Sequence, residues 1–214
     1  MTEPMQGRRP IASRDSGWAR SVAAFLARHG VSPNFISILS IVFAAISTVA
    51  FYLDARTGEL HLLWMLLAIV GIQGRLLMNL FDGMVAVEHN KKSVVGGIYN
   101  EVPDRVSDTL TFLGLAFIVE PFPYGRDLVY LAIALSITTA YIRTLGASLQ
   151  VGHHFLGPMA KQHRMALVTT GCIAHVWYPP TFYYLLIVMN IGLLITCYRR
   201  LANIIHLLKS TAKG

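Results

Sequence analysis

The chain has 214 residues, of which 54% are hydrophobic and only 14% are charged, and its formal net charge is +7. The charged fraction lies well below the roughly 25% of soluble domains, which excludes an ordinary soluble fold and predicts an all-α polytopic membrane protein. In such a protein a positive balance is typical of cytoplasmic loops that face anionic lipid, so we expect no nucleic acid among its partners. The two cysteines, Cys172 and Cys197, lie in apolar stretches and indicate buried free thiols.

Residues 1–30 are predicted to form a cytoplasmic tail followed by an amphipathic helix at the membrane interface. The first 16 residues are polar and rich in Arg and Pro, which indicates disorder, and no run long enough for a cleaved signal peptide follows. Apolar residues then recur at positions 18, 22, 25 and 26, at helical spacing. A short helix packed on the protein itself is the alternative interpretation.

Six apolar segments predict a transmembrane domain over residues 31–208, which leaves 209–214 as a cytoplasmic tail. The predicted segments are 35–53, 60–81, 96–119, 128–149, 165–178 and 182–197. The fifth can extend back to Lys161, and the sixth can continue towards Leu208. The third is polar in its first half and apolar in its second.

The basic residues orient these segments. They gather before the first helix, between the second and third, between the fourth and fifth, and after the sixth, whereas the opposite connections hold only Arg56 and Arg126. The positive-inside rule therefore places both termini in the cytoplasm of a cell whose plasma (inner) membrane holds the protein.

Acidic and amide side chains gather where the second apolar segment ends and the third begins. Asp104 and Asp108 are four residues apart, so a helix places both on one face, and Glu101 joins that face. Asn79 and Asp82 share a face in the same way. Carboxylates at membrane depth are costly and therefore mark a functional site. If the two faces pack together, their oxygen atoms suit Mg²⁺, Mn²⁺ or Ca²⁺ rather than zinc.

Two stretches of the chain resemble the signature of the CDP-alcohol phosphotransferase family, namely Asp82-Gly83-x-x-Ala86 and Asp104-x-x-x-Asp108. That signature reads D-x-x-D-G-x-x-A-R, a short spacer, then G-x-x-x-D-x-x-x-D. Three of its four aspartates are therefore present. The chain departs from the signature at Asn79, Val87 and Asn100, which stand in place of an aspartate, an arginine and a glycine.

The resemblance implies that the aspartates bind metal and that the last of them is the catalytic base. The ligands would be Asp82, Asp104 and Asp108, with Asn79 in the first position, and they would hold a pair of Mg²⁺ or Mn²⁺ ions. Asp108 would take the proton of an acceptor hydroxyl, and Asp82 would also contact the nucleotide. Because Asn79 supplies no charge, Glu101 can restore that charge to the metal site.

Small and polar residues around the aspartates are predicted to contact the donor nucleotide. Gly83 and Ala86 allow its close approach, with helix–helix packing as the alternative. Asn100 lies on the metal-binding face and either bonds the nucleotide or satisfies a neighbour. Lys92 and Ser93, in the loop between the two faces, can contact donor phosphates, although a solvated positive loop also fits them.

Basic residues in the second half of the chain are predicted to bind the acceptor or a lipid phosphate. They are Arg143, Lys161 and Arg164, the last two near a helix N-terminus, where backbone N–H groups add affinity for anions. Arg75 can balance the carboxylates from a second layer. Arg105 points away from Asp104 around the helix, and a structural ion pair is its expected role.

The sequence therefore predicts a membrane transferase that moves a phosphatidyl or similar phospho-alcohol group from a CDP-linked lipid to an alcohol and releases CMP. We favour CDP-diacylglycerol with a small polar acceptor, and a homodimer, on the family resemblance alone. An intramembrane prenyltransferase, which also uses aspartates and Mg²⁺, is one alternative. A lipid-binding relative that has lost catalysis is the other, because of the three departures from the signature.

Overall fold

The computed structural model describes residues 16–211 apart from residues 90, 92, 153 and 154. The predicted N-terminal tail and the phosphate-binding role of Lys92 therefore lie outside the described residues. Those residues form seven helices and no strand. The helices are α1 (Gly17–Arg28), α2 (Pro33–Thr57), α3 (His61–Glu88), α4 (Gly96–Val119), α5 (Gly125–Ser148), α6 (Lys161–His175) and α7 (Thr181–Thr211).

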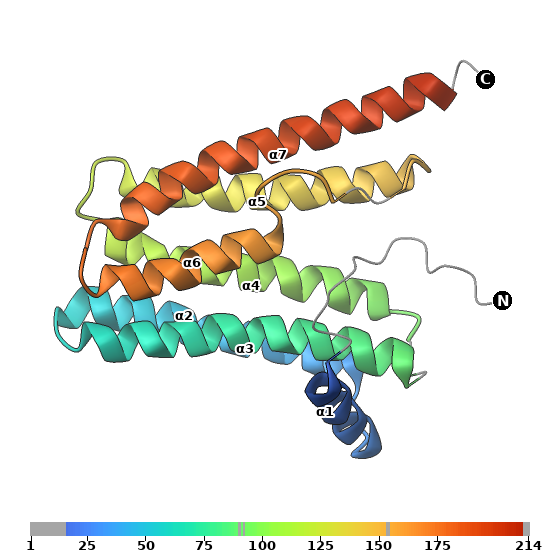
Figure 1. Cartoon of the computed structure of the whole chain (residues 1–214), viewed down its shortest axis with the longest axis horizontal. Helices are drawn as coiled ribbons and strands as arrows, with labels where there is room; N and C mark the ends of the chain where they lie inside the picture. The colour runs from blue at the N-terminus through green and yellow to red at the C-terminus, as the bar shows by residue number, and fades with distance from the viewer. Residues whose placement is uncertain (1–15, 90, 92, 153–154, 212–214) are drawn as a thin grey trace.

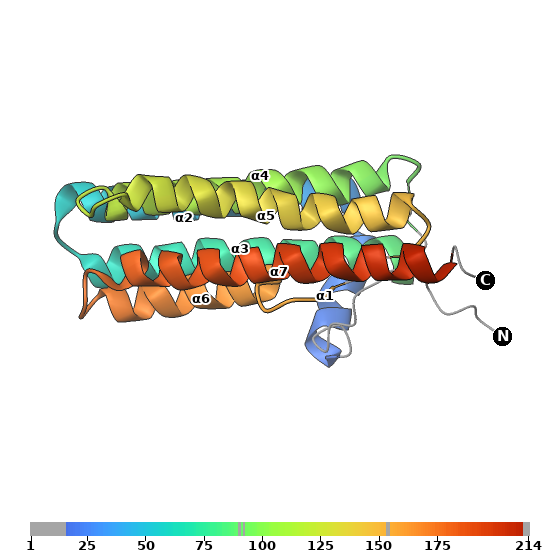
Figure 2. The same ribbon diagram turned by 90° about the horizontal axis from the view of Figure 1, so that it is seen from above.

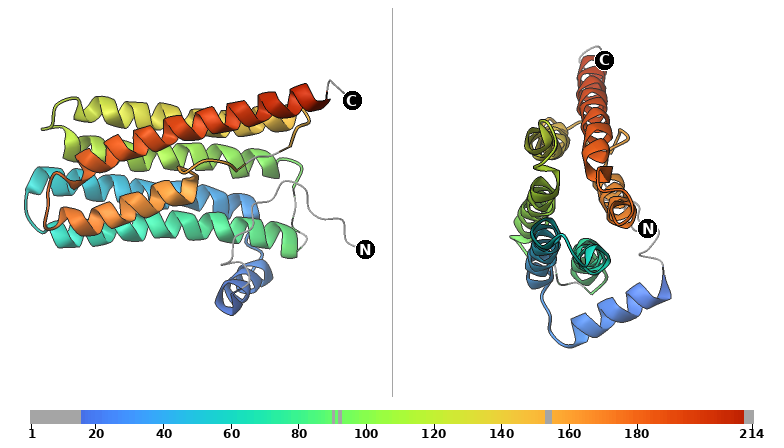
Figure 3. Two further views of the ribbon diagram at one scale, coloured as in Figure 1. Left: turned by 45° about the horizontal axis from the view of Figure 1, so that its top comes forward. Right: turned by 90° about the vertical axis from the view of Figure 1, so that its left-hand side faces the viewer.

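Helices α2–α7 form a two-layer bundle, and α1 lies across one end of it (Figure 1). Seen from above, α2, α4 and α5 form one layer while α3, α6 and α7 form the other (Figure 2). The end-on view separates the same two columns of helices (Figure 3). Helix α2 packs along both α3 and α4, α5 packs on α7, and α6 bridges α3 and α7.

Local sequence signals set several helix ends. Ser32 caps α2 by accepting a hydrogen bond from the backbone N–H of Phe35 at 3.2 Å, and Pro33 fits the first helical position because it needs no N–H partner there. Gly58 ends α2 with a left-handed backbone, φ 62°, that glycine adopts without strain. Helix α3 continues to Glu88, beyond the end predicted at residue 81 from the apolar run.

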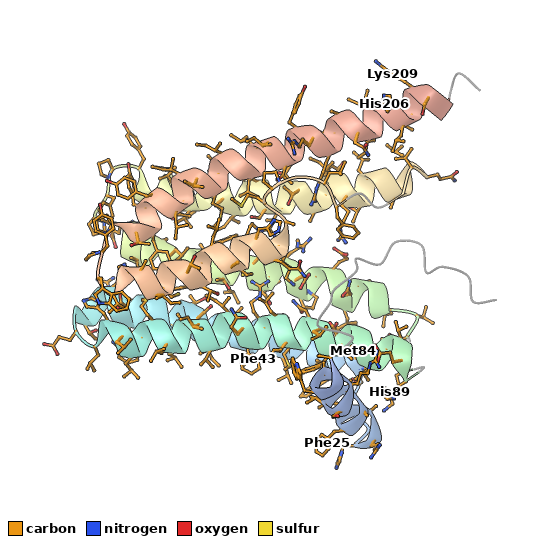
Figure 4. All side chains as sticks on the ribbon, in the orientation of Figure 1. Phe25, Phe43, Met84, His89, His206 and Lys209 are labelled. Carbon is orange, nitrogen blue, oxygen red and sulfur yellow. The ribbon has the colours of Figure 1, made fainter. Side chains whose placement is uncertain are left out.

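Small residues let α2 approach its two neighbours closely. A Cβ atom at Gly71 of α3 would meet the backbone carbonyl oxygen of Phe43 at 2.6 Å, and one at Gly74 would collide with the Phe43 ring. Phe43 is labelled beside α3 in Figure 4. Towards α4, the hydroxyls of Ser40 and Ser107 are 3.2 Å apart. Small and hydroxyl-bearing residues are typical of helix interfaces in membranes, where close packing replaces the hydrophobic effect.

The bundle buries an apolar core and also presents a wide apolar surface. Phe51, Phe112 and Phe182 are buried in the core, whereas Val42, Leu66 and other large apolar residues lie more than half exposed. Among the described helices, α2, α3, α5 and α7 are long and apolar enough to cross a membrane. Helix α6, with 15 residues, is only about 22 Å long. The six-span count therefore stays a prediction for α4 and α6.

Helix α1 packs against α3 through its small residues. Ala19 and Ala23 are buried in a cluster that includes Phe81 and Met84 of α3, and Met84 is labelled beside α1 in Figure 4. Phe25 is 58% exposed on α1. The contact with α3 fits a helix packed on the protein, and the exposed Phe25 fits an amphipathic helix at the membrane interface. The location of α1 at a membrane interface therefore stays a prediction.

Candidate active site

A polar cavity of about 270 Å³ opens between helices of the two layers, near the part of α3 that packs against α1. We call it the basic cavity, because five of its lining residues are cationic: Arg105, Arg143, Lys161, Arg164 and Arg200. Its wall also includes six further residues that the sequence singled out: Asn79, Asp82, Gly83, Asn100, Glu101 and Asp104. Helices α3, α4, α5, α6 and α7 all contribute to this wall, so residues far apart in sequence meet here.

A second cavity of about 330 Å³ lies beside the first and beneath the α3–α4 loop. We call it the loop cavity. Its lining includes the predicted nucleotide contacts Ala86 and Ser93, together with Ser37 of α2. Three residues line both cavities: Asp82, Gly83 and Asn100. The two cavities therefore meet at Asp82, the first of the three motif aspartates that are present in this chain.

Asp82 has one oxygen bonded and one that is not. Ser37 donates a hydrogen bond from its hydroxyl to Asp82 Oδ2 at 2.6 Å. The other oxygen, Oδ1, is buried without a well-formed hydrogen bond, and the residue is only 5% exposed. A buried carboxylate oxygen with no donor is costly, which makes this atom suited to a cation.

Asp104 lies opposite, on α4, with partners from three helices. Its Oδ1 accepts hydrogen bonds from Asn79 Nδ2 at 2.6 Å and from Lys161 Nζ at 2.5 Å. Arg105 lies 3.5 Å from Oδ2, so it forms a long ion pair with the neighbour from which it was expected to point away. The Asp104 side chain is 19% exposed, so a ligand in the basic cavity can reach it. Asn79 thus faces Asp104 through its amide, in place of a second carboxylate.

Asp108 occupies a different environment and corrects the predicted convergence. It is not among the residues that line the basic cavity. Its Oδ1 is paired with Arg75, and its Oδ2 accepts a hydrogen bond from Arg164 Nη2 at 2.7 Å. The i, i+4 spacing gives both aspartates the same helix face, but one turn carries Asp108 deeper into the bundle. Arg75, predicted to balance the charge of the carboxylates, therefore balances that of Asp108.

Glu101 lines the basic cavity but is held by arginines. Arg143 of α5 donates to Glu101 Oε1 at 2.5 Å, and Arg105 lies 3.5 Å from Oε2. Its side chain is 36% exposed. In this arrangement Glu101 neutralises Arg143 and Arg105, and its ion pairs are with these arginines rather than with groups at Asn79 or Asp82.

Two residues of the cavities were missed by the sequence reasoning. Arg200 of α7 is 5% exposed, and it donates to the backbone oxygen atoms of Leu156 at 3.0 Å and Thr139 at 2.5 Å. A basic residue at the end of a long apolar run is typical of a cytoplasmic anchor, so the sequence did not indicate that Arg200 is buried. Ser37 is a small residue in an apolar helix, and only its packing against α3 reveals it as the partner of Asp82.

The fold and the site together define a polytopic membrane protein with a buried cluster of carboxylates beside a basic cavity. No family model matches the sequence. The inner membrane protein YnbA of Escherichia coli (strain K12) is 28% identical over 160 residues, which cover 75% of this chain and 76% of that protein.

Crystal structures of the phosphatidylinositol phosphate synthase PgsA1 of Mycobacterium tuberculosis share the fold. The complex with manganese and citrate aligns with a TM-score of 0.72 at 19% identity, over 87% of this chain and 88% of that chain. The structure with CDP-DAG bound aligns with a TM-score of 0.71 at 19% identity, over 88% and 94%. The chain therefore shares the fold of this synthase, and that fold agrees with the resemblance expected from the aspartate motif.

Proposed function

We propose that this protein is a membrane transferase that moves a phosphatidyl or related phospho-alcohol group from a CDP-linked lipid to an alcohol acceptor, with release of CMP. The meeting of the two cavities at Asp82, Gly83 and Asn100 carries this proposal. It offers two substrates adjacent chambers with carboxylate and amide oxygens between them. The shared fold with a synthase crystallised with CDP-DAG supports the same reading.

Four oxygen donors line the basic cavity, two of them shared with the loop cavity, and they fit hard divalent cations. Two ions of Mg²⁺ or Mn²⁺ would be held in the proposal by Asn79, Asp82, Asn100 and Asp104. Asp82 Oδ1 is a buried oxygen without a well-formed hydrogen bond, so it gains most from such a partner. When bound, the ions would offset the negative charge that develops on the donor phosphates. Asp108 and Glu101, which were predicted as further ligands, already have arginine partners.

The loop cavity is the proposed donor site. Gly83 and Ala86 line it on α3, and Ser93 and Gly97 line it on the opposite side. A Cβ atom at Gly97 would meet nothing within 4 Å, so this wall has open space beside the backbone. Small residues on both sides let a nucleotide approach the backbone closely.

The basic cavity is the proposed acceptor site. Arg143, Lys161 and Arg164 would bind an anionic group of the acceptor or of the lipid, and they would orient its hydroxyl towards the donor. As the hydroxyl oxygen forms its bond to phosphorus, the bond to the CMP oxygen breaks, and CMP leaves with the electron pair.

The proton of the acceptor hydroxyl needs a carboxylate within reach. Of the three acids that line the basic cavity, Asp82 is buried and Glu101 is paired with Arg143, whereas Asp104 is partly exposed and bonded to Lys161 and Asn79. We therefore assign the base to Asp104. Asp108, the base predicted from the motif, would instead hold Arg75 and Arg164 in place.

The proposal places the protein in the plasma (inner) membrane with its termini and site facing the cytoplasm. The apolar helices and the inner-membrane location of the E. coli relative support a membrane location. A homodimer stays a prediction.

The test is release of CMP from CDP-diacylglycerol by the purified protein with Mn²⁺ or Mg²⁺ against a panel of alcohols and phosphorylated alcohols. Acceptor-dependent release that falls by about 10²–10⁴-fold in Asp104→Asn is the expected result. Asp127→Asn, which changes an exposed acid in the first turn of α5, is the matched control and should retain activity.

Three outcomes would overturn parts of the proposal. Release of pyrophosphate from a prenyl donor would favour the prenyltransferase alternative. Binding of CDP-diacylglycerol with no turnover on any acceptor would favour the inactive lipid-binding relative. Full activity in Asp104→Asn, together with its loss in Asp108→Asn of unchanged thermal stability, would return the base to Asp108.

A further inference from the structure

A second cluster of metal-ligating side chains lies at the end of the bundle opposite the two cavities. Asp54 at the end of α2, His61 at the start of α3 and His175 at the end of α6 each direct one ligand atom to a common point, and these atoms lie within 4.8 Å of one another. Along α2, Asp54 is 17 residues from Ser37, the partner of Asp82, which is about 25 Å of helix. The cluster is therefore separate from the proposed active site.

The two histidines contact opposite oxygens of one carboxylate. His61 Nδ1 lies 2.7 Å from Asp54 Oδ1, and His175 Nε2 lies 3.1 Å from Asp54 Oδ2. Asp54 and His175 are 2% and 5% exposed, whereas the His61 side chain is 42% exposed. The common point is thus lined by buried ligands on two sides and reached from outside on the third.

The hydrogen bonding of His175 explains why a cation suits this point. Pro179 presents a backbone carbonyl, which only accepts, so His175 Nδ1 must donate to it over their 3.0 Å contact. Nε2 is then the ring nitrogen left to bind a cation, and it lies 3.1 Å from Asp54 Oδ2. A donated N–H on the far ring nitrogen is the usual support of a metal-bound histidine.

We infer that Asp54, His61 and His175 form a site for a borderline transition-metal cation, best Zn²⁺, with an open coordination position towards the outside. Two imidazole nitrogens and a carboxylate oxygen are a common zinc donor set. With zinc–ligand bonds of about 2.0–2.1 Å, tetrahedral donors lie about 3.3 Å apart. The 3.1 Å contact of His175 is near this spacing, and the 2.7 Å contact of His61 would lengthen when the ion binds. The ion would tie the ends of α2, α3 and α6 together at one point.

Zinc binding to the purified full-length protein tests this inference. After removal of metals with a chelator, the protein is dialysed against Zn²⁺ in the presence of excess Mg²⁺, which competes at the oxygen-rich cavity, and bound zinc is measured per chain. One equivalent should stay bound and raise the apparent melting temperature. His61→Gln should weaken zinc binding by at least about 100-fold, as losses of supporting partners alone reach 10–100-fold.

His206→Gln is the matched control, because His206 is exposed near the far end of α7 (Figure 4). It should bind zinc as the unchanged protein does. Since His61 is partly exposed, its replacement should fold, which equal melting temperatures of the metal-free proteins would check. Co²⁺ should give the visible absorption of a tetrahedral site in the unchanged protein and lose it in His175→Gln. Equal zinc binding by the unchanged protein and by His61→Gln would overturn the inference, and so would an absence of zinc binding to both.

Discussion

Asp104 and Asp108 occupy successive turns of one helix, yet the two regions around them differ in nearly every physical respect. The Asp104 side chain is 19% exposed and is held by a lysine and an amide at the wall of the basic cavity. The Asp108 side chain is 3% exposed and is held by two arginines. One turn of α4 therefore separates two environments. A ligand can replace the partners of Asp104, whereas Asp108 is closed off by its two arginines.

The difference indicates two separate tasks. A buried charge with both oxygens bonded to guanidinium groups keeps its partners, because any loss leaves an uncompensated ion in a medium of low dielectric constant. A partly exposed carboxylate can exchange its partners at lower cost. The Asp108 region therefore fixes the relative positions of α3, α4 and α6, and the Asp104 region is free to bind and to react.

The largest expected effect is on stability, from Asp108→Asn. Removal of this charge leaves Arg75 and Arg164 buried without a counter-charge, which should cost about 3–5 kcal/mol of the free energy of unfolding. Asp104→Asn should cost no more than about 1 kcal/mol, because its region is partly solvated. Chemical denaturation of both variants in detergent gives the comparison. Equal losses would show that the two regions do not differ as described.

A smaller effect is expected from Asn79→Asp, which places a second carboxylate against Asp104. Without metal the two charges repel, whereas a divalent cation between them gains a charged ligand. The Mn²⁺ concentration for half-maximal activity should therefore fall by about tenfold. Gln150→Glu is the matched control, since it makes the same amide-to-acid change at an exposed position beyond the end of α5. An unchanged Mn²⁺ requirement in Asn79→Asp would argue against a metal at Asp104.

The smallest effect is expected from Glu101→Gln. Because Glu101 is paired with Arg143 and Arg105, its neutral form should mainly alter how those arginines hold the acceptor. We expect a change of about threefold to tenfold in the acceptor KM, with the Mn²⁺ requirement unchanged, as for a partly exposed ion pair. Steady-state kinetics at varied acceptor and varied metal concentrations measure the acceptor KM and the Mn²⁺ requirement separately. A loss of activity as large as that of Asp104→Asn would instead restore Glu101 to the metal site.

The helices could largely be predicted from the sequence, because apolar runs of membrane length leave few alternatives. The third run gave α4 with the same ends, 96–119, and the second gave α3 with an end seven residues too early. Asp82 interrupts the apolar run although the helix continues through it to Glu88. A site residue inside a helix therefore looks, from hydropathy alone, like the end of the helix.

The residues of the candidate site could be predicted from the sequence, but their burial and their ion-pair partners could not. The spacing of Asp104 and Asp108 gave their common face correctly. It could not show that Arg75 and Arg164, which lie 33 and 56 residues away from Asp108, would close around only one of them. Ion pairing between helices depends on which helical turns lie at the same height in the bundle. Packing contacts such as those of Gly71 and Gly74 decide that alignment.

The glycine contacts between α2 and α3 also bear on how such a protein can diversify. Gly71 and Gly74 admit no side chain against Phe43, so this helix pair has little freedom to drift in sequence or in register. The pair carries Ser37, Asn79 and Asp82, whereas the cations of the basic cavity come mainly from α5, α6 and α7. Together with Asn100 and Asp104 of α4, this pair holds the proposed metal ligands and base, so selection for a new acceptor can act on α5–α7 while the chemistry is inherited unchanged on α2–α4. A chimaera that exchanges α5–α7 between relatives is therefore a rational route to altered acceptor choice.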